Sequence, residues 1–179
     1  MGMTARADPR IAEPARALQE RIAALGRAHE FVRPHSETSR PQAIDVTLGN
    51  LLANILSAYP AMSDGRLTIT GGDFEIHDRA ATPLALTFHE LATNSLKYGA
   101  LSSDTGRVAI IIENADDIIH MAWAESEGPV VDAEPELSGF GSKLTTLAVQ
   151  QQLGGTLERT WHRTGLEVTM KVQAGRVRL

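Results

Sequence analysis

Apolar residues recur along the chain at two periods, which separate helical from extended segments. Residues 14–33 carry Leu18, Ile22, Leu25 and Ala28 at spacings of four, three and three. These spacings return to one side of a helix, so the segment is predicted to be an amphipathic helix. If its apolar stripe is exposed it needs a partner, and a homodimer is therefore expected.

Two further segments have the helical period and clear stops. Residues 45–59 place five apolar side chains on one face and are followed by Pro60, which we expect to end the helix. Residues 141–153 are predicted to form another helix, which Gly154 and Gly155 close.

A long helix is also predicted in the middle of the chain. Thr82 is expected to be its N-cap and Pro83 its first residue, because proline needs no N–H partner there. The helix is predicted to run to Tyr98 and to end at Gly99. Its core face is expected to carry Leu84, Phe88, Leu91 and Ser95.

Short runs of extended character complete the pattern. Strands are predicted at residues 66–70, 74–76, 107–113, 118–125, 156–161 and 166–172. The last of these alternates, with apolar side chains on one face and polar ones on the other. Strands and helices are mixed without strict alternation, which favours a two-layer α/β sandwich over a doubly wound parallel sheet.

Composition limits the class of protein. The chain has 179 residues, no cysteine and a net charge of −5, which excludes disulfides and argues against general nucleic-acid binding. No apolar run approaches the length of a membrane span, and the first residues do not form a secretory signal. We expect a flexible N-terminus (1–13), a helix (14–33), a linker (34–43) and one domain (44–175), in the cytoplasm.

The second face of the central helix carries Glu90, Asn94 and Lys97 at spacings of four and three. Because one turn is 3.6 residues, these side chains share one stripe. An ordinary solvated helix face would show the same pattern. The stripe also suits a nucleotide, with a carboxylate base, an amide oxygen for Mg²⁺ and an ammonium for phosphate. On the stripe alone, both interpretations stand.

Other candidate motifs are individually weak. His89 and Glu90 begin the zinc-protease pattern H-E-x-x-H, but the fifth position is Thr93, so that class is excluded. The W-A-E motif ending at Glu125 puts a carboxylate near a strand end, where it could accept a hydrogen bond from adenine. A G-F-G motif at 139–141 precedes a helix, whose free N–H groups suit a phosphate.

The order of these motifs is more specific than any one of them. The stretches HELATNSLKYGALS, WAESEGP, GFGSKL and QLGGTLERTW follow one another at suitable spacing. Together they resemble the Bergerat (GHKL) ATP-binding domain, and most closely that of the HWE and HisKA_2 sensor histidine kinases. The histidine and the W-x-E after which that class is named would be His89, Trp123 and Glu125. The resemblance covers roughly residues 15–173.

The resemblance implies a fold, cofactors and a site. It implies a mixed sheet with helices on one face. It also implies that the N-terminal helix, residues 14–33, is the remnant of a dimerisation helix. It implies ATP and Mg²⁺, with Glu90 and Asn94 as catalytic residues and Asn94 as the metal ligand. The residues it assigns to ATP binding are His89, Asn94, Lys97, Tyr98, Glu125, Gly128, Gly139, Phe140, Gly141, Lys143 and Thr156. Residues 126–138 would be the ATP lid, and Thr156 would lie near the adenine.

The implied function is transfer of the ATP γ-phosphate to a histidine, for relay to the receiver domain of a response regulator. No motif like H-R-x-K-N-x-L precedes the first helix, so we expect the phosphoacceptor on dimerisation helices supplied in cis or in trans. The lid is acidic, and Glu127 stands where the family has a glycine. Two alternatives therefore stay open: a degenerate phosphotransferase or scaffold of the same fold, and an anti-sigma-factor-type serine kinase.

Overall fold

The computed structural model describes residues 9–32, 46–133 and 140–179. In chain order the elements are α1 (Pro9–Val32), α2 (Leu48–Leu56), α3 (Pro60–Ser63), β1 (Leu67–Gly71), α4 (Asp78–Lys97), η1 (Ala100–Ser102), β2 (Arg107–Ala115), β3 (Ile118–Ser126), α5 (Phe140–Leu147), η2 (Ala148–Gln152), β4 (Thr156–His162), β5 (Gly165–Gln173) and α6 (Ala174–Val177).

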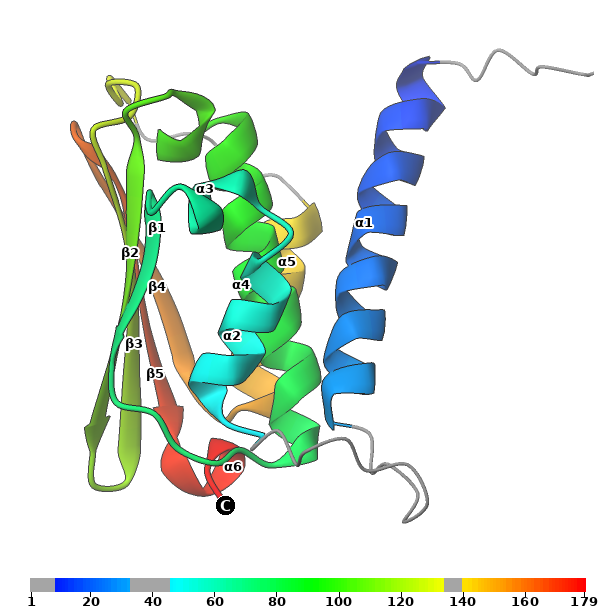
Figure 1. Cartoon of the computed structure of the whole chain (residues 1–179), viewed down its shortest axis with the longest axis vertical. Helices are drawn as coiled ribbons and strands as arrows, with labels where there is room; N and C mark the ends of the chain where they lie inside the picture. Colours follow the sequence, from blue (N-terminus) through cyan, green and yellow to red (C-terminus); the bar gives the residue numbers. More distant parts are fainter. Residues whose placement is uncertain (1–8, 33–45, 134–139) are drawn as a thin grey trace, which may run out of the picture.

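One five-stranded sheet organises the molecule. The strand order is β1-β2-β3-β5-β4, with β1 and β2 parallel and the remaining neighbours antiparallel. The helices cover one face of this sheet, and α1 lies on the side of α4 away from it (Figure 1). The predicted two-layer α/β sandwich with a mixed sheet is confirmed.

The core lies between the sheet and the helices α2 and α4. The four alternating apolar residues of β5, from Leu166 to Val172, are all buried, as the strand pattern predicts. Phe88 of α4 and Trp123 of β3 are fully buried between the two layers. Each such side chain stabilises the fold by roughly 1.5–3 kcal/mol through apolar burial.

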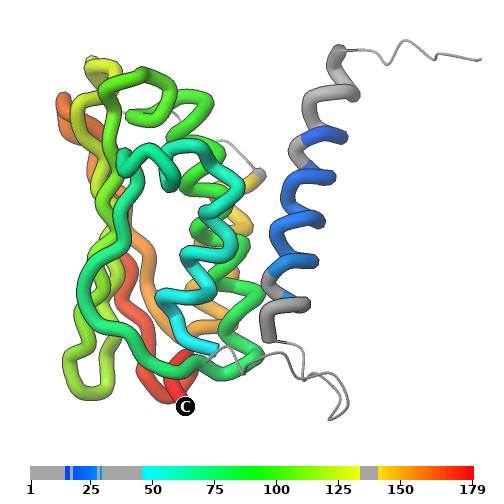
Figure 2. Tube along the Cα trace, in the orientation of Figure 1, coloured from blue at the N-terminus to red at the C-terminus, as the bar shows by residue number. Residues whose placement is uncertain are grey.

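The start of α4 was predicted wrongly. The helix begins at Asp78, and Pro83 lies inside it instead of at its first position. The backbone N–H of His77, the N-cap residue, donates to the carbonyl of Val177, 2.8 Å away. A contact with the end of the chain therefore fixes this helix start. Figure 2 shows the C-terminus beside the segment that leads from β1 into α4.

The predicted strand at 74–76 does not form. Glu75 and Ile76 make only single bridges, the first to Thr47 and the second to Arg178. Adjacent residues thus pair with two different parts of the chain, which does not build a ladder. Val177 is fully buried, so the domain continues past the predicted boundary at residue 175.

Other helix boundaries also shift. Thr47 caps α2 by accepting the N–H of Asn50 at 3.3 Å, so this helix begins at Leu48 instead of residue 45. This helix ends at Leu56, before the predicted stop at Pro60, and Pro60 is instead the first residue of α3. The predicted helix at 141–153 is α-helical only to Leu147 and π-helical from 148 to 152.

The N-terminal helix begins at Pro9, earlier than the predicted residue 14. The predicted linker at 34–43 and residues 1–8 of the predicted flexible N-terminus lie outside the described residues. Within the described ranges, no helix has the length and apolar character needed to cross a membrane.

Candidate functional site

Glu125 is a buried carboxylate held from two sides. It lies near the end of β3 and is only 8% exposed. The backbone N–H of Ala100, just after α4, donates to its Oε2 at 2.9 Å. The indole Nε1 of Trp123 donates to its Oε1 at 3.2 Å. A carboxylate offers about four lone-pair sites, so two donors leave acceptor capacity for a ligand.

Glycines let the backbone approach this carboxylate. A Cβ on Gly99 would overlap the Glu125 carboxylate, although the φ of Gly99 is −102° and needs no glycine. A Cβ on Gly165 would lie 2.6 Å from the carbonyl oxygen of Glu125, and one on Gly128 would overlap the backbone of Ala100. Close packing around Glu125 therefore requires these glycines.

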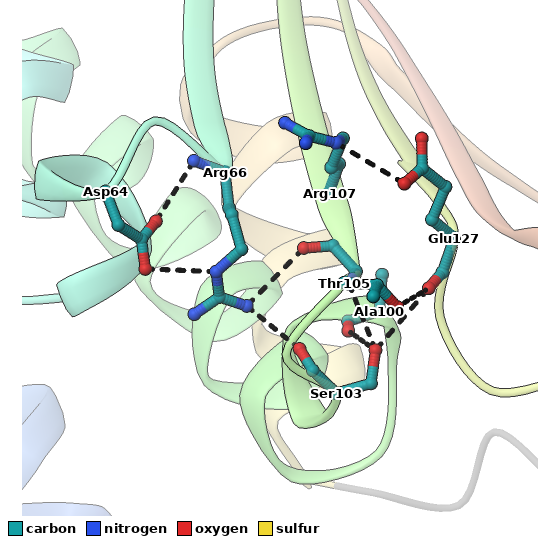
Figure 3. Close-up of polar contacts among 8 residues, drawn as sticks. Asp64, Arg66, Ala100, Ser103, Thr105, Arg107 and Glu127 are labelled. Carbon is teal, nitrogen blue, oxygen red and sulfur yellow. Dashed lines mark hydrogen bonds and ion pairs between the residues drawn. The ribbon is translucent and has the colours of Figure 1, made fainter.

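The loop after η1 fixes the start of the predicted lid (Figure 3). Thr105 Oγ1 donates to the carbonyl of Glu127 at 3.0 Å, and Ser103 Oγ donates to the same oxygen at 3.4 Å. Arg66 Nη1 in turn donates to the carbonyl of Ser103 at 2.9 Å. Glu127 has a left-handed φ of 56°, which favours glycine. This backbone conformation gives a physical reason for the glycine that the family places there.

Glu90 is engaged by the N-terminal helix. Its carboxylate is 3% exposed and accepts both Nε and Nη2 of Arg21 from α1, the second at 2.8 Å. The hydrogen bond with Glu90 raises the pKa of Arg21. A Cβ on Gly141 would overlap the Glu90 carboxylate, so the start of α5 lies directly against this ion pair.

The remaining residues of the predicted stripe are more open. Asn94 is partly exposed, and Lys97 and Tyr98 are exposed, the latter at 78%. Among the described residues, no cluster of three histidine, aspartate or glutamate side chains could hold a metal ion. The amide oxygen of Asn94 fits one position of Mg²⁺, which commonly takes its other ligands from phosphate and water.

His89 faces a different part of the helix layer. Its Nδ1 lies 2.7 Å from the hydroxyl of Tyr59, which also lies 3.0 Å from Thr93 Oγ1. Burial lowers the pKa of His89, which favours the neutral imidazole. The structure thus places His89 in a buried polar network with Thr93 and with Tyr59, which lies between α2 and α3.

Two predicted ATP-binding residues lie apart from Glu90 and Glu125. Lys143 is two positions after Gly141, about 200° around α5, so its side chain leaves the opposite side of the helix. It lines a cavity of about 390 Å³ together with Arg159 of β4. Thr156 pairs with Lys171 at the start of β4. It is five residues, or roughly 17 Å, from Trp161, which lies at the other end of this strand, near Gly165 and Glu125. Gly139 and the side chain of Phe140 lie outside the described residues.

Sequence reasoning missed three contacts of the site. These are the indole donor of Trp123, the backbone donor of Ala100 and the guanidinium of Arg21. The two-residue spacing of W-x-E places both side chains on one face of a strand, which could have indicated the first contact. The other two join segments 25 and 69 residues apart, for which the chain carries no local signal.

Comparisons with known proteins show what the whole chain resembles. No protein-family model matches the chain. It is 34% identical over 169 residues to blue-light-activated histidine kinase 1 of Erythrobacter litoralis, which covers 93% of this chain and 46% of that protein. The chain thus spans less than half the length of that relative.

Two solved structures share the fold. The histidine kinase domain of the Erythrobacter litoralis EL346 blue-light-activated histidine kinase superposes with a TM-score of 0.68 at 21% identity, over 90% of this chain and 81% of that one. The catalytic domain of histidine kinase ThkA gives 0.54 at 12% identity, over 71% and 93%. By homology and by fold, the chain is related to the histidine kinases and has the architecture of their catalytic domain.

Proposed function

We propose that this chain is the ATP-binding catalytic part of an HWE-type sensor histidine kinase. One observation carries the proposal: the buried carboxylate of Glu125 and the glycine-lined start of α5 lie at two ends of one stretch of α4. Ala100, just past the end of α4, holds Glu125, and Gly141 contacts Glu90 further back along the helix.

This arrangement suits Mg-ATP. From Glu90 to Lys97, α4 rises about 10 Å, a length suited to a nucleotide lying along the helix. The adenine amine would donate to Glu125, and the phosphates would reach the backbone at Gly141. Asn94 would offer an oxygen to Mg²⁺ between them. Lys97 would lie along the nucleotide, where its long, flexible side chain can reach back toward the phosphates.

The reaction we propose is phosphoryl transfer to a histidine. An imidazole nitrogen attacks the γ-phosphorus, the bond to the β–γ bridging oxygen breaks, and ADP leaves with that electron pair. Glu90 would take the imidazole proton after Arg21 releases its carboxylate. Positioning and charge neutralisation supply most of the rate in such transfers.

Partners follow from the same proposal. The phosphoacceptor would lie on dimerisation helices, and the receiver domain of a response regulator would accept the phosphoryl group in the cytoplasm. On α1, Leu18 is 54% exposed and Ile22 is 60% exposed. This stripe supports a homodimer, because an apolar helix face in water is stabilised by a second helix.

The direct test is calorimetric titration with a non-hydrolysable ATP analogue and Mg²⁺. Asn94→Ala should weaken binding by more than tenfold, because the metal loses an oxygen ligand. Asn54→Ala is the matched control, since Asn54 is an exposed asparagine on α2. Equal affinities for the wild type and Asn94→Ala would contradict the site.

The bidentate contact of Arg21 with Glu90 favours one alternative, a scaffold that binds ATP without transferring phosphate. Incubation with radiolabelled ATP and a separate protein carrying a histidine on a dimerisation helix distinguishes the two. Label on that histidine supports the kinase, and nucleotide binding without label supports the scaffold.

A further inference from the structure

The Glu125 carboxylate is fixed more firmly than a simple acceptor requires. Its two oxygens have separate donors from separate elements, Trp123 of β3 and the backbone at the start of η1. Gly99 packs so closely that even a Cβ there would overlap the carboxylate. The plane of the carboxylate is therefore set before any ligand arrives.

Trp123 is built to supply one of these donors. Its side chain is fully buried in the core, so its ring has no freedom to turn its N–H elsewhere. Trp123 and Glu125 are two residues apart on β3, which directs both side chains to the same face of the sheet. A buried indole N–H normally has a partner, and here that partner is Glu125 Oε1, 3.2 Å away.

The two tryptophans differ in what their indole N–H groups contact. Trp161 lies on β4 and is separated from β3 by β5. Its Nε1 is buried and has no hydrogen-bond partner among the described residues. The chain thus contains one tryptophan that orients a carboxylate and one that serves packing.

We propose that Trp123 is a positioning residue that sets the nucleobase specificity of the site. The inference rests on the proposed function, in which Glu125 accepts the exocyclic amine of adenine. A carboxylate held in one plane accepts that amine well. The same carboxylate opposes a 6-oxo group, because two acceptors then face each other and the hydrogen bond from the amine is replaced by repulsion. Release of one oxygen lets the carboxylate turn, which lowers the discrimination between the two bases.

The test compares an adenosine and an inosine triphosphate analogue, both non-hydrolysable, on three proteins. The wild type and Trp161→Phe should share the same preference for the adenine analogue. Trp123→Phe keeps most of the ring volume but removes the N–H, and should lower adenine affinity about tenfold with little change for inosine. A change in the ratio of affinities is the readout, because a packing defect weakens both analogues alike.

A second measurement covers the case in which Trp123→Phe does not fold. The chain has two tryptophans, so in Trp161→Phe the only one left is Trp123. Its emission should shift when the adenine analogue binds. The shift should be lost in Trp161→Phe/Glu125→Gln at the same analogue concentration, with circular dichroism checking that this protein is folded.

Each outcome decides the inference. An unchanged affinity ratio in folded Trp123→Phe would overturn it while leaving the ATP site intact, as would an emission shift that persists without the Glu125 carboxylate. If the wild type binds neither analogue, the proposed function fails and this inference fails with it.

Discussion

Glu127 has a backbone conformation that its side chain does not favour. A left-handed φ costs a non-glycine residue about 1–2 kcal/mol, whereas glycine loses about 0.5–1 kcal/mol of chain entropy. The ion pair of Glu127 with Arg107 spans 3.4 Å between two exposed side chains and adds little. Glu127→Gly should therefore raise the free energy of unfolding by about 0.5 kcal/mol, measured by urea denaturation.

The control for that variant is Glu127→Gln. This change removes the charge but keeps the Cβ, so it should give no gain in stability. A loss of more than about 0.5 kcal/mol in Glu127→Gly would mean that the side chain of Glu127 stabilises the loop more than its backbone strains it.

His89 should make the stability of the fold depend on pH. Burial is the main cause that lowers its pKa, nearby Glu90 opposes it, and the ordinary value is 6.5. As the pH falls below that value, the unfolded chain takes up a proton that the folded chain does not. The unfolded state then binds more protons, so stability is lost as the pH falls through this range.

The measurement is the free energy of unfolding at about pH 7.5 and about pH 5.5, on either side of the ordinary pKa of histidine. His89→Asn keeps a polar atom near the Tyr59 hydroxyl but does not titrate, so its stability should fall less between the two conditions. Equal falls in both proteins would show that other groups dominate the pH dependence.

Sequence reasoning predicted the candidate carboxylates of the site but not their contacts. Glu90 and Glu125 were predicted to be functional from spacing and motif, and both are buried, Glu90 on α4 and Glu125 on β3. Their immediate partners, Arg21 and Ala100, were not predicted, because a donor contributed by a distant segment leaves no periodic pattern.

At the scale of elements, the ends of helices were predicted less well than their faces. The buried face of α4 contains Leu84, Phe88, Leu91 and Ser95, as predicted from their spacing. Its start was misplaced because Thr82 and Pro83 form a plausible local signal. A hydrogen bond from His77 to the distant Val177 determines the true start, and His77 makes no side-chain cap.

The packing of α1 on α4 yields a prediction of its own. Arg21 joins these helices through its ion pair with Glu90, and its loss would leave the Glu90 carboxylate buried without that partner. Arg21→Gln should therefore destabilise the packed arrangement by up to about 3 kcal/mol. Hydrogen exchange should become faster along α1 and stay unchanged in the strands of the sheet.

Arg16→Gln is the matched control. Arg16 pairs with Glu20 within the same helix at 3.0 Å, and its side chain is exposed. Such an i,i+4 pair contributes only about 0.3–0.5 kcal/mol. If Arg16→Gln and Arg21→Gln accelerate exchange in α1 equally, the ion pair with Glu90 does not hold the helix.

At the scale of the whole molecule, the layers were predictable and the long-range contacts were not. Alternation in β5 and the helical period in α2 each identify a buried face, and two such faces define a sandwich. The order in which β5 inserts between β3 and β4 depends on the pairing of strands remote in sequence, which no period encodes.

A site spread over α4, β3 and α5 should couple nucleotide binding to global stability. A ligand that binds only the folded chain stabilises it by about 2.7 kcal/mol at a concentration 100 times its Kd. For a chain of this size that corresponds to a rise in Tm of roughly 5–10 °C. Mg-ATP analogue should produce this rise in a thermal melt, and Asn94→Ala should abolish most of it.

Charge determines how the rise in Tm on nucleotide binding should depend on Mg²⁺. Glu127 and Asp132 place negative charge in the described part of the lid, and the triphosphate adds more. Removing Mg²⁺ with a chelator should therefore reduce the rise in Tm strongly for the triphosphate and little for adenosine, which carries no phosphate. Equal rises for the triphosphate with and without Mg²⁺ would show that Asn94 does not act through a metal ion and that Lys97 or the backbone at Gly141 neutralises the phosphates instead.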